Sequence, residues 1–201
     1  MTHRHFLIHK PFGYLSQFVC ELKKKKLLGE LYDFPEGTMA IGRLDEHSEG
    51  LLLLTTDGRV SEMVRSKGVE KEYYAQVDGL ITDEAVAQLQ QGVEIGLRDV
   101  KYQTSPCTAF RLETPPSFPP RTKKIRDDRH GPTSWVSITL TEGKFRQIRK
   151  MTAAVGFPTL RLVRVRVGNI HLHNLPPGGV QEVVNFALPE REEVGSLHCS
   201  S

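Results

Sequence analysis

The chain has 201 residues, of which 38% are hydrophobic and 25% charged, a composition typical of globular proteins with a sizeable core. No apolar stretch reaches the roughly 18 residues that a membrane helix needs, and the first residues lack the apolar core of a signal peptide, so we expect a cytoplasmic protein that does not contact a membrane. The three cysteines, Cys20, Cys107 and Cys199, are scattered, which excludes a disulfide framework or a cysteine metal site.

The net charge is only +3, but the basic residues are unevenly distributed. Residues 143–181 hold seven lysines and arginines and no acidic residue, and a second basic cluster lies within residues 121–129. Clustering of this kind indicates a face that binds a polyanion such as nucleic acid. A solvated surface that happens to be basic is the alternative interpretation.

In the N-terminal half, apolar periodicity and turn residues predict an alternation of strands and helices. The predicted elements are a strand at 6–8, a short amphipathic piece at 27–31, a strand at 51–54, a helix from 57 to about 68, a strand at 73–77 and a helix from 82 to 92. Asp57 and Thr82 are suitable N-cap residues, and Gly68 and Gly92 are suitable at the C-terminal ends of these helices.

In the C-terminal half, the pattern predicts strands at 110–112, 135–140 and 160–167, and we expect the last two to pair with each other. Five prolines make residues 114–132 a loop. A helix with Phe145, Ile148, Thr152 and Val155 on its apolar face ends at Gly156.

Strands and helices follow one another without regular βαβ alternation, which predicts an α+β fold with a largely antiparallel mixed sheet flanked by helices and loops. We expect one domain over residues 1–190, with a division into subdomains 1–62 and 63–190 as an alternative. The polar residues 191–201 are predicted to form a flexible C-terminal tail.

Two features of the charged residues require an explanation. The loop at 42–50 holds three acidic residues, an arginine and a histidine directly before four leucines, and its Asp45 suits either a turn or a catalytic carboxylate. On the predicted helix, Arg146, Arg149 and Lys150 share one face, where mutual repulsion costs stability unless phosphates or a carboxylate lie opposite.

Three segments, in this order, resemble the motifs of the pseudouridine synthases. They are Gly42-Arg43-Leu44-Asp45 with the following Gly50–Thr55, then Lys71-Glu72-Tyr73, then Glu142–Met151. Their spacing resembles the branch named for small-subunit synthase A, although Thr56 replaces the usual Asn and Arg146 an often present His. The resemblance implies a pseudouridine synthase catalytic fold without the N-terminal S4 domain that many members carry.

Segments at 6–12, 133–135 and 156–162 resemble a subfamily of this branch that acts on 23S ribosomal RNA. The resemblance therefore implies an enzyme that converts a uridine of ribosomal RNA to pseudouridine, with the RNA either free or in an assembly intermediate. This isomerisation involves no redox change and no net hydrolysis, so it requires no cofactor or metal. We also expect the protein to be a monomer. Asp45 would either attack C1′ of the ribose or remove the C2′ proton to give a glycal, and both routes stay open. Arg149 would lie opposite Asp45 and keep it ionised. Tyr73 would stack on the uracil and accept its C5 proton.

Further residues are expected to hold the RNA. Ile148 would pack below the flipped base, and Arg43 would clamp its phosphate. Lys71 is either structural or directed at the RNA. The predicted RNA-binding residues are Arg43, Lys71, Arg146, Lys150, Arg164 and Arg166.

Two other functions remain open from the residues alone. The acid-free basic stretch is also typical of a noncatalytic RNA-binding or ribosome-assembly module. Asp45 and Glu49 are two neighbouring carboxylates, which is a feature of acid–base hydrolases. His171 and His173 have no further ligands nearby in the sequence and are expected to be surface residues.

Overall fold

The computed structural model describes residues 2–65, 68–98, 100–125 and 128–186, and the predicted tail at 191–201 lies outside them. The described helices are α1 (Gly58–Arg65), α2 (Asp83–Gln91) and α3 (Gln147–Ala154), with short 3-10 turns at Leu28–Glu30 and Asp128–His130. The strands are β1 (His5–Lys10), β2 (Met39–Ile41), β3 (Glu49–Thr55), β4 (Lys71–Asp78), β5 (Glu94–Leu97), β6 (Val100–Gln103), β7 (Thr108–Leu112), β8 (Thr133–Leu140), β9 (Thr159–Val167), β10 (Ile170–His171) and β11 (Val180–Val183).

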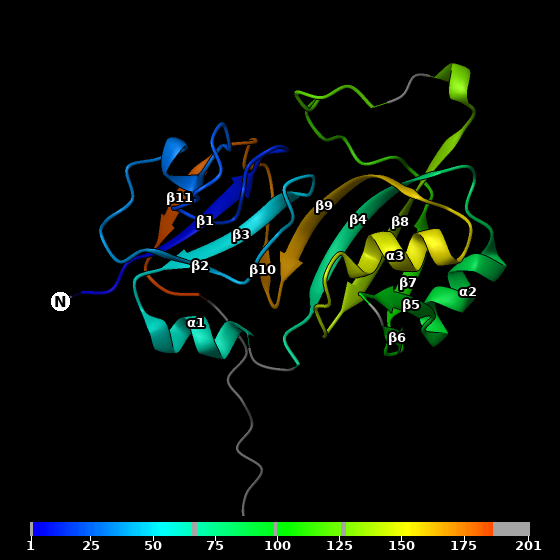
Figure 1. The fold of residues 1–201 in the computed structure, drawn as a ribbon, viewed down its shortest axis with the longest axis horizontal. Coiled ribbons are helices and arrows are strands. Elements are labelled where there is room, and N and C mark those ends of the chain that lie inside the picture. Colours follow the sequence, from blue (N-terminus) through cyan, green and yellow to red (C-terminus); the bar gives the residue numbers. More distant parts are fainter. Residues whose placement is uncertain (1, 66–67, 99, 126–127, 187–201) are drawn as a thin grey trace, which may run out of the picture.

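One mixed sheet runs the length of the molecule in the order β11-β1-β3-β9-β4-β8-β7, with β2 paired to β3 and β10 to β9. Figure 1 shows α1 at one end of this sheet and α2 and α3 at the other. All the strand pairs in this sheet are antiparallel except β3 with β9, which joins the two ends. The α+β class with a largely antiparallel sheet is confirmed. Continuity across β3 and β9 supports a single domain over residues 1–190, which stays a prediction.

The parallel junction between β3 and β9 depends on Gly50. Gly50 lies opposite Arg164, and a Cβ atom at Gly50 would come within 2.3 Å of the Arg164 carbonyl oxygen. Its φ of +105° is also a conformation that favours glycine. Only glycine therefore allows the two backbones to approach this closely.

The four leucines of β3 are explained by apolar cores on both faces of the strand. Leu51 and Leu53 belong to one buried cluster, whereas Leu52 and Leu54 belong to another. All seven residues of β3 are buried. A strand covered on both faces has no need of polar alternation, which is why the sequence is a continuous apolar run.

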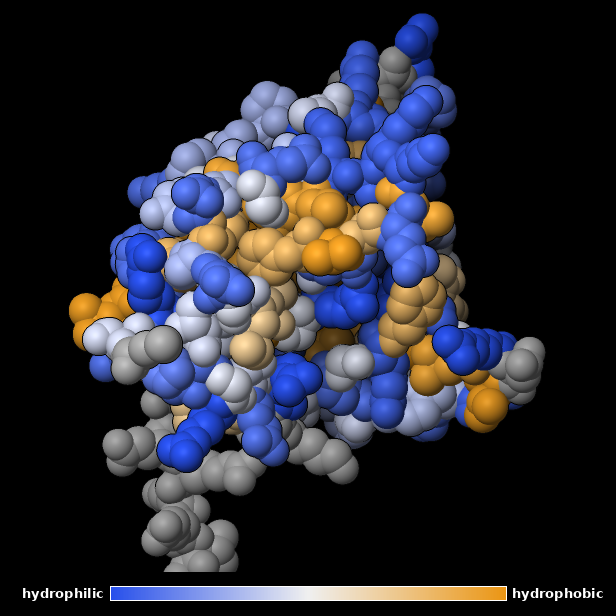
Figure 2. All heavy atoms as spheres, turned by 60° about the vertical axis from the view of Figure 1, so that its left-hand side comes forward, coloured by the Kyte–Doolittle hydropathy of each residue, from blue (hydrophilic) through white to orange (hydrophobic). Residues whose placement is uncertain are grey.

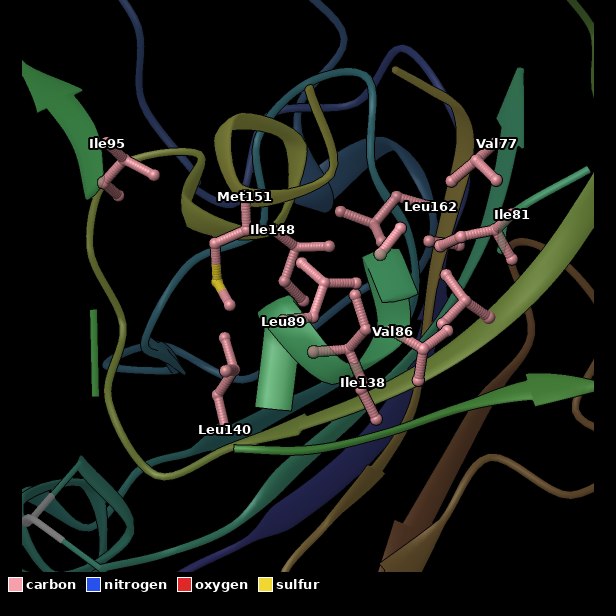
Figure 3. Packing of buried hydrophobic residues seen from close by; sticks show 14 residues of the cluster. Val77, Ile81, Val86, Leu89, Ile95, Ile138, Leu140, Ile148, Met151 and Leu162 are labelled. Atoms are coloured by element: carbon pink, nitrogen blue, oxygen red, sulfur yellow. The ribbon is translucent and has the colours of Figure 1, made fainter. Parts of the chain in front are cut away.

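A third cluster holds α2 and α3 against the opposite end of the sheet. In Figure 3, Ile148 and Met151 of α3 and Leu89 of α2 converge on Ile138 and other strand residues. The apolar face of α3 is therefore a core face, and the opposite side of this helix is available to carry charged groups.

Two predictions about this region are wrong. The strand at 133–140 does not pair with 159–167, because β4 lies between them and pairs with both. Periodicity identifies a strand but says nothing of its neighbours. Phe145 is not on the helix face: α3 begins at Gln147, and Phe145 is 73% exposed. The left-handed backbone of Arg146 (φ 53°) separates the two.

Several short elements escaped the sequence pattern, namely β2, the β5–β6 hairpin and β11. The loop predicted at 114–132 is confirmed for its described residues, 114–125 and 128–132, which contain no helix or strand apart from the 3-10 turn at Asp128–His130. Residues 126–127 of this prediction lie outside the described residues. Thr82 caps α2 as expected, since its side chain accepts a hydrogen bond from the Ala85 N–H at 3.2 Å.

Within the described ranges, every helix is too short to cross a membrane. The face in Figure 2 is largely hydrophilic, with hydrophobic residues gathered in a band across its middle.

Candidate active site

The loop that precedes β3 is held in place by hydrogen bonds from Gly13 and Ser16. The Ser16 hydroxyl donates to the Leu44 carbonyl at 2.8 Å and accepts from the Leu44 N–H at 3.0 Å. The Gly13 N–H donates to the Glu46 carbonyl at 2.8 Å. With the Leu44 side chain buried in the core, the backbone on both sides of Asp45 is fixed.

Four groups surround the Asp45 carboxylate. Oδ1 accepts from the His47 N–H at 2.9 Å and lies 3.2 Å from a guanidinium nitrogen of Arg146. Oδ2 accepts from the Ser48 hydroxyl at 2.9 Å and lies 3.4 Å from Nε of Arg149. The side chain keeps 18% of its surface exposed, so the carboxylate remains accessible from the adjacent cleft.

These contacts keep Asp45 ionised. Burial alone would raise the pKa of Asp45, but the charge of Arg149, the Ser48 hydroxyl and the weaker contributions of Arg146 and the His47 N–H together hold that pKa below its ordinary value. The loop can therefore present a negative oxygen beside an apolar strand.

Arg149 is fixed between α3 and the loop that holds Asp45. Besides Asp45, its guanidinium donates to the His47 carbonyl at 2.8 Å and to Thr159 O at 3.5 Å, and the side chain is only 11% exposed. The structure thus brings Arg149 and Asp45 together across 104 residues of sequence. Their catalytic roles remain predictions.

Arg146 was predicted to contact RNA from the helix, but in the structure it is the residue before α3 and pairs with Asp45. A left-handed backbone is uncommon for arginine and has to be maintained by its surroundings. The preceding turn supplies this support: Glu142 accepts hydrogen bonds from Tyr102 Oη at 2.6 Å and from the Gln147 side-chain amide at 2.6 Å, and Gln147 accepts one from the Lys144 N–H.

Asp45 lines a cleft with a volume of about 800 Å³. Tyr73 and Ile148 line this cleft, and Ile148 is 4% exposed, at its floor. The Tyr73 hydroxyl lies 3.5 Å from a guanidinium nitrogen of Arg164. Tyr74 is on the other side of the strand and packs against Phe118 at 6.2 Å between ring centroids, as the alternation of a strand requires.

The remaining predicted RNA-binding residues fall into two groups. Arg43 is exposed at the cleft and donates only to Gln17 among the described contacts. The others make hydrogen bonds within the protein: Lys71 to Val69 O, Lys150 to Gly96 O, Arg164 to Leu51 O, and Arg166 to Glu70 and Glu72. Arg164 is also 4% exposed. These contacts favour structural roles for the second group.

Sequence reasoning missed a buried layer of charge under the loop. Lys10 is fully buried and donates to the carbonyls of Pro11 and Tyr14. Burial lowers the pKa of the Lys10 ammonium to about 8, although the carboxylates of Asp45 and Glu49 oppose this shift. A lysine at the end of an apolar strand was the only signal, and it does not distinguish a buried residue from a surface one.

Glu49 forms a buried bidentate pair with Arg161, with Nε and a terminal nitrogen at 3.0 and 2.8 Å from its two oxygens. Glu49 is 1% exposed and does not line the cleft. It is therefore not available as the second carboxylate of a hydrolase, which removes the basis for that alternative.

Among the described residues there is no group of three or more histidine, cysteine, aspartate or glutamate side chains that could hold a metal ion. The cleft presents the ionised Asp45 carboxylate, the Tyr73 phenol and the apolar side chain of Ile148. Two further carboxylates line it, but Glu46 is bound to Lys25, and Glu142 to Tyr102 and Gln147. An arrangement of this kind suits covalent or acid–base catalysis at a sugar carbon.

Comparison with known proteins defines the class. A family model described as RNA pseudouridylate synthase matches residues 4–154, which is more than half of the sequence. The chain belongs to this family. It is therefore an enzyme that isomerises uridine in RNA to pseudouridine.

Relatives place the chain more narrowly within the family. Ribosomal large subunit pseudouridine synthase E from Xanthomonas campestris pv. campestris is 40% identical over 174 residues, which are 86% of this chain and 91% of the relative. Ribosomal large subunit pseudouridine synthase B from Yersinia pestis is 36% identical over 153 residues, covering 72% of this chain and 41% of the relative. The crystal structure of a pseudouridylate synthase matches with a TM-score of 0.69 and 26% identity, covering 90% of this chain and 70% of that one.

Proposed function

We propose that this enzyme converts a specific uridine of 23S ribosomal RNA to pseudouridine, with Asp45 as the essential carboxylate. The carrying observation is the ionised Asp45 at the cleft, held between Arg146 and Arg149 at 3.2 and 3.4 Å. Similarity to large-subunit synthases over most of the chain supports the choice of 23S RNA.

The reaction balances without a co-reactant. The C1′–N1 bond breaks, the uracil turns while it is held in the cleft, and C1′ rejoins the base through C5. The C5 proton is then lost and N1 gains a proton. Asp45 supplies the negative oxygen that attacks C1′ or removes the C2′ proton, and the route that follows either step regenerates the carboxylate.

The neighbouring residues have separate parts in this proposal. Arg149 and Arg146 keep Asp45 deprotonated and aimed at the ribose. Ile148 forms an apolar surface on which the free uracil can turn, and the Tyr73 hydroxyl accepts the C5 proton. Arg164, buried beside Tyr73, holds this phenol in position.

An embedded uridine must leave its stack to reach Asp45, at a cost of a few kcal/mol. Arg43, which is exposed at the cleft two residues before Asp45, binds the phosphate of the displaced nucleotide in this proposal. Lys71 and Lys150 are secondary candidates, since each already donates to a backbone carbonyl. We also propose that the enzyme acts as a cytoplasmic monomer.

The direct test is modification of an unmodified 23S rRNA transcript, with pseudouridines mapped by carbodiimide treatment and primer extension. Wild-type protein should produce a new stop at one uridine, and Asp45→Asn should produce none while binding the RNA as before. Undiminished stops with Asp45→Asn would contradict the role of Asp45. A purely RNA-binding role would instead leave the wild type without any stop, and stops on a 16S transcript only would contradict the choice of substrate.

A further inference from the structure

Phe145 is exposed where a phenylalanine gains nothing from the protein core. Its exposure is 73%, against 46% for Phe110 and 42% for Tyr32. Burying such a side chain would contribute about 1.5–3 kcal/mol, and here that contribution is not made. Phe145 nevertheless belongs to the wall of the cleft that contains Asp45 and Tyr73.

The exposure of Phe145 does not result from a loosely held loop. On one side, Arg146 is paired with Asp45. On the other, the Lys144 N–H donates to the Gln147 side chain, which in turn donates to Glu142. Both neighbours of Phe145 are thus tied to the protein, and the ring is presented to solvent from a fixed turn.

Basic side chains lie near the Phe145 ring. The Lys150 ammonium lies 5.4 Å from its centroid, within the range of a cation–π contact. Lys144 and Arg146 are its neighbours in the chain, and both also line the cleft. These cations also have partners within the protein, since Arg146 pairs with Asp45, Lys150 donates to Gly96 O and Lys144 lies over the Tyr102 ring. The exposed ring is therefore the group that matches a nucleic-acid base, because bases stack on aromatic rings whatever their sequence.

We propose that Phe145 is a substrate-binding residue whose ring stacks on a base of the RNA strand next to the target uridine. The target base itself belongs deeper, beside Tyr73 and the almost fully buried Ile148. Phe145 at the lip meets the neighbouring nucleotide and holds the strand open while the uridine is in the cleft. This inference rests on the proposed function and adds to it a second base contact.

The first test compares kinetics of four variants on a 23S rRNA substrate. Stacking by a single base corresponds to about 1–3 kcal/mol, so Phe145→Ala should raise KM by about 5- to 150-fold with kcat changed far less. Phe145→Leu keeps apolar area but lacks a π face and should not rescue binding, whereas Phe145→Trp should. Phe110→Ala, which removes an exposed ring from β7, is the matched control and should behave as wild type.

The second test measures stacking without turnover. Trp135 is the single native tryptophan and is 8% exposed, so wild-type fluorescence should respond little to RNA. In Phe145→Trp on an Asp45→Asn background, the new tryptophan should be quenched when the 23S fragment is added, and the quenching should saturate with binding.

The two proposals fail in different ways. A wild-type protein that makes no pseudouridine in 23S RNA contradicts the proposed substrate, whatever the fluorescence shows. Active wild type with an unchanged KM in Phe145→Ala, with full rescue by Phe145→Leu, or with no quenching of Trp at position 145 overturns the stacking proposal.

Discussion

Asp45 shows how a charged side chain is kept beside an apolar strand. Its carboxylate loses water on burial, and two hydrogen bonds and two guanidinium groups restore more than that loss. Arg149 bears part of the cost, because burial lowers the pKa of its guanidinium. The pair is an arrangement in which removal of one partner leaves an uncompensated charge.

Arg146→Gln tests the electrostatic part of this arrangement. The pKa of Asp45 is lowered in the folded enzyme, so the wild-type rate should be limited by protonation only at distinctly acidic pH. Without the charge of Arg146 the pKa of Asp45 rises. In a plot of kcat against pH, the fall in rate on the acidic side should therefore move to higher pH. Lys150→Gln removes a cation from α3 that binds Gly96 O and not Asp45, so the pH at which the rate falls should stay unchanged. If the rate of Arg146→Gln fell at the same acidic pH as that of the wild type, the claim that Arg146 lowers the pKa of Asp45 would be refuted.

We expect the buried Lys10 to make the free energy of unfolding depend on pH. Its pKa is about 8 when folded and near 10.5 when unfolded, so between these values the unfolded chain binds more protons and the free energy of unfolding rises with pH. Relative to Lys10→Met, the wild type should gain up to about 3 kcal/mol across this window and nothing below pH 8. Urea denaturation at a series of pH values measures the difference. A constant difference would mean that Lys10 titrates alike in both states.

At the scale of elements, the cleft depends on two contacts between distant segments. One is the parallel approach of β3 to β9 at Gly50, which places the Asp45 loop at the edge of α3. The other is the hydrogen bond from Tyr102 on β6 to Glu142, which supports the turn before α3. Each contact is made by a single residue whose role is not apparent from its local sequence.

Gly50→Ala should be strongly destabilising, because the new methyl group would meet the backbone of Arg164 in a left-handed conformation. We expect a loss of at least about 3 kcal/mol or failure to fold. Gly58→Ala, at the open first position of α1, should be neutral or mildly stabilising. Thermal unfolding followed by circular dichroism compares the two, and equal melting temperatures would contradict the argument.

Tyr102→Phe should loosen the turn that carries Phe145 and Arg146. Loss of one hydrogen bond to a charged acceptor at a partly exposed site should cost about 1 kcal/mol in unfolding free energy. Activity should fall more than this small loss of stability suggests, since the turn also positions groups at the cleft. Tyr74→Phe removes a hydroxyl from β4, outside the lining of the cleft, and serves as the control. Equal activity in the two variants would show that the hydrogen bond from the β5–β6 hairpin to Glu142 does not influence the active site.

At the scale of the molecule, the cleft lies between the loop that precedes β3 and the turn that precedes α3, and both basic and acidic side chains line it. Arg43 and Arg146 both line the cleft and come from segments about a hundred residues apart. We therefore expect RNA to contact both segments while the target uridine occupies the cleft. Binding of this kind depends on phosphate contacts and on salt.

The salt dependence of RNA affinity distinguishes free from internally paired arginines. Arg43→Gln should weaken binding and reduce the slope of log Kd against log salt by about one, because one phosphate contact is lost. Arg166→Gln should leave the slope unchanged, since Arg166 is paired with Glu70 and Glu72. Filter binding between low and moderate salt measures both. The reverse order of effects would show that the sheet arginines face the RNA.

Sequence alone determined the parts of this protein that depend on local pattern and on motif. Periodicity located β3, β8, β9 and α2, and three motifs were sufficient to identify the family and to predict that Arg149 lies opposite Asp45. These succeed because a strand or helix repeats its apolar residues at a fixed period and because a motif keeps its chemistry in consecutive residues.

Tertiary structure alone decided which groups the charges meet and which strands are neighbours. Seven basic residues in one stretch predicted an RNA-binding face, yet Arg161, Arg164 and Arg166 make their contacts inside the protein, and Arg146 meets Asp45. Phe145 lies outside the helix in which it was predicted, because the next residue, Arg146, has a left-handed backbone conformation. A sequence specifies the sign and spacing of its charges, but the partners of Arg146, Arg161 and Arg166 come from segments about a hundred residues away, which lie nearby only in the folded protein.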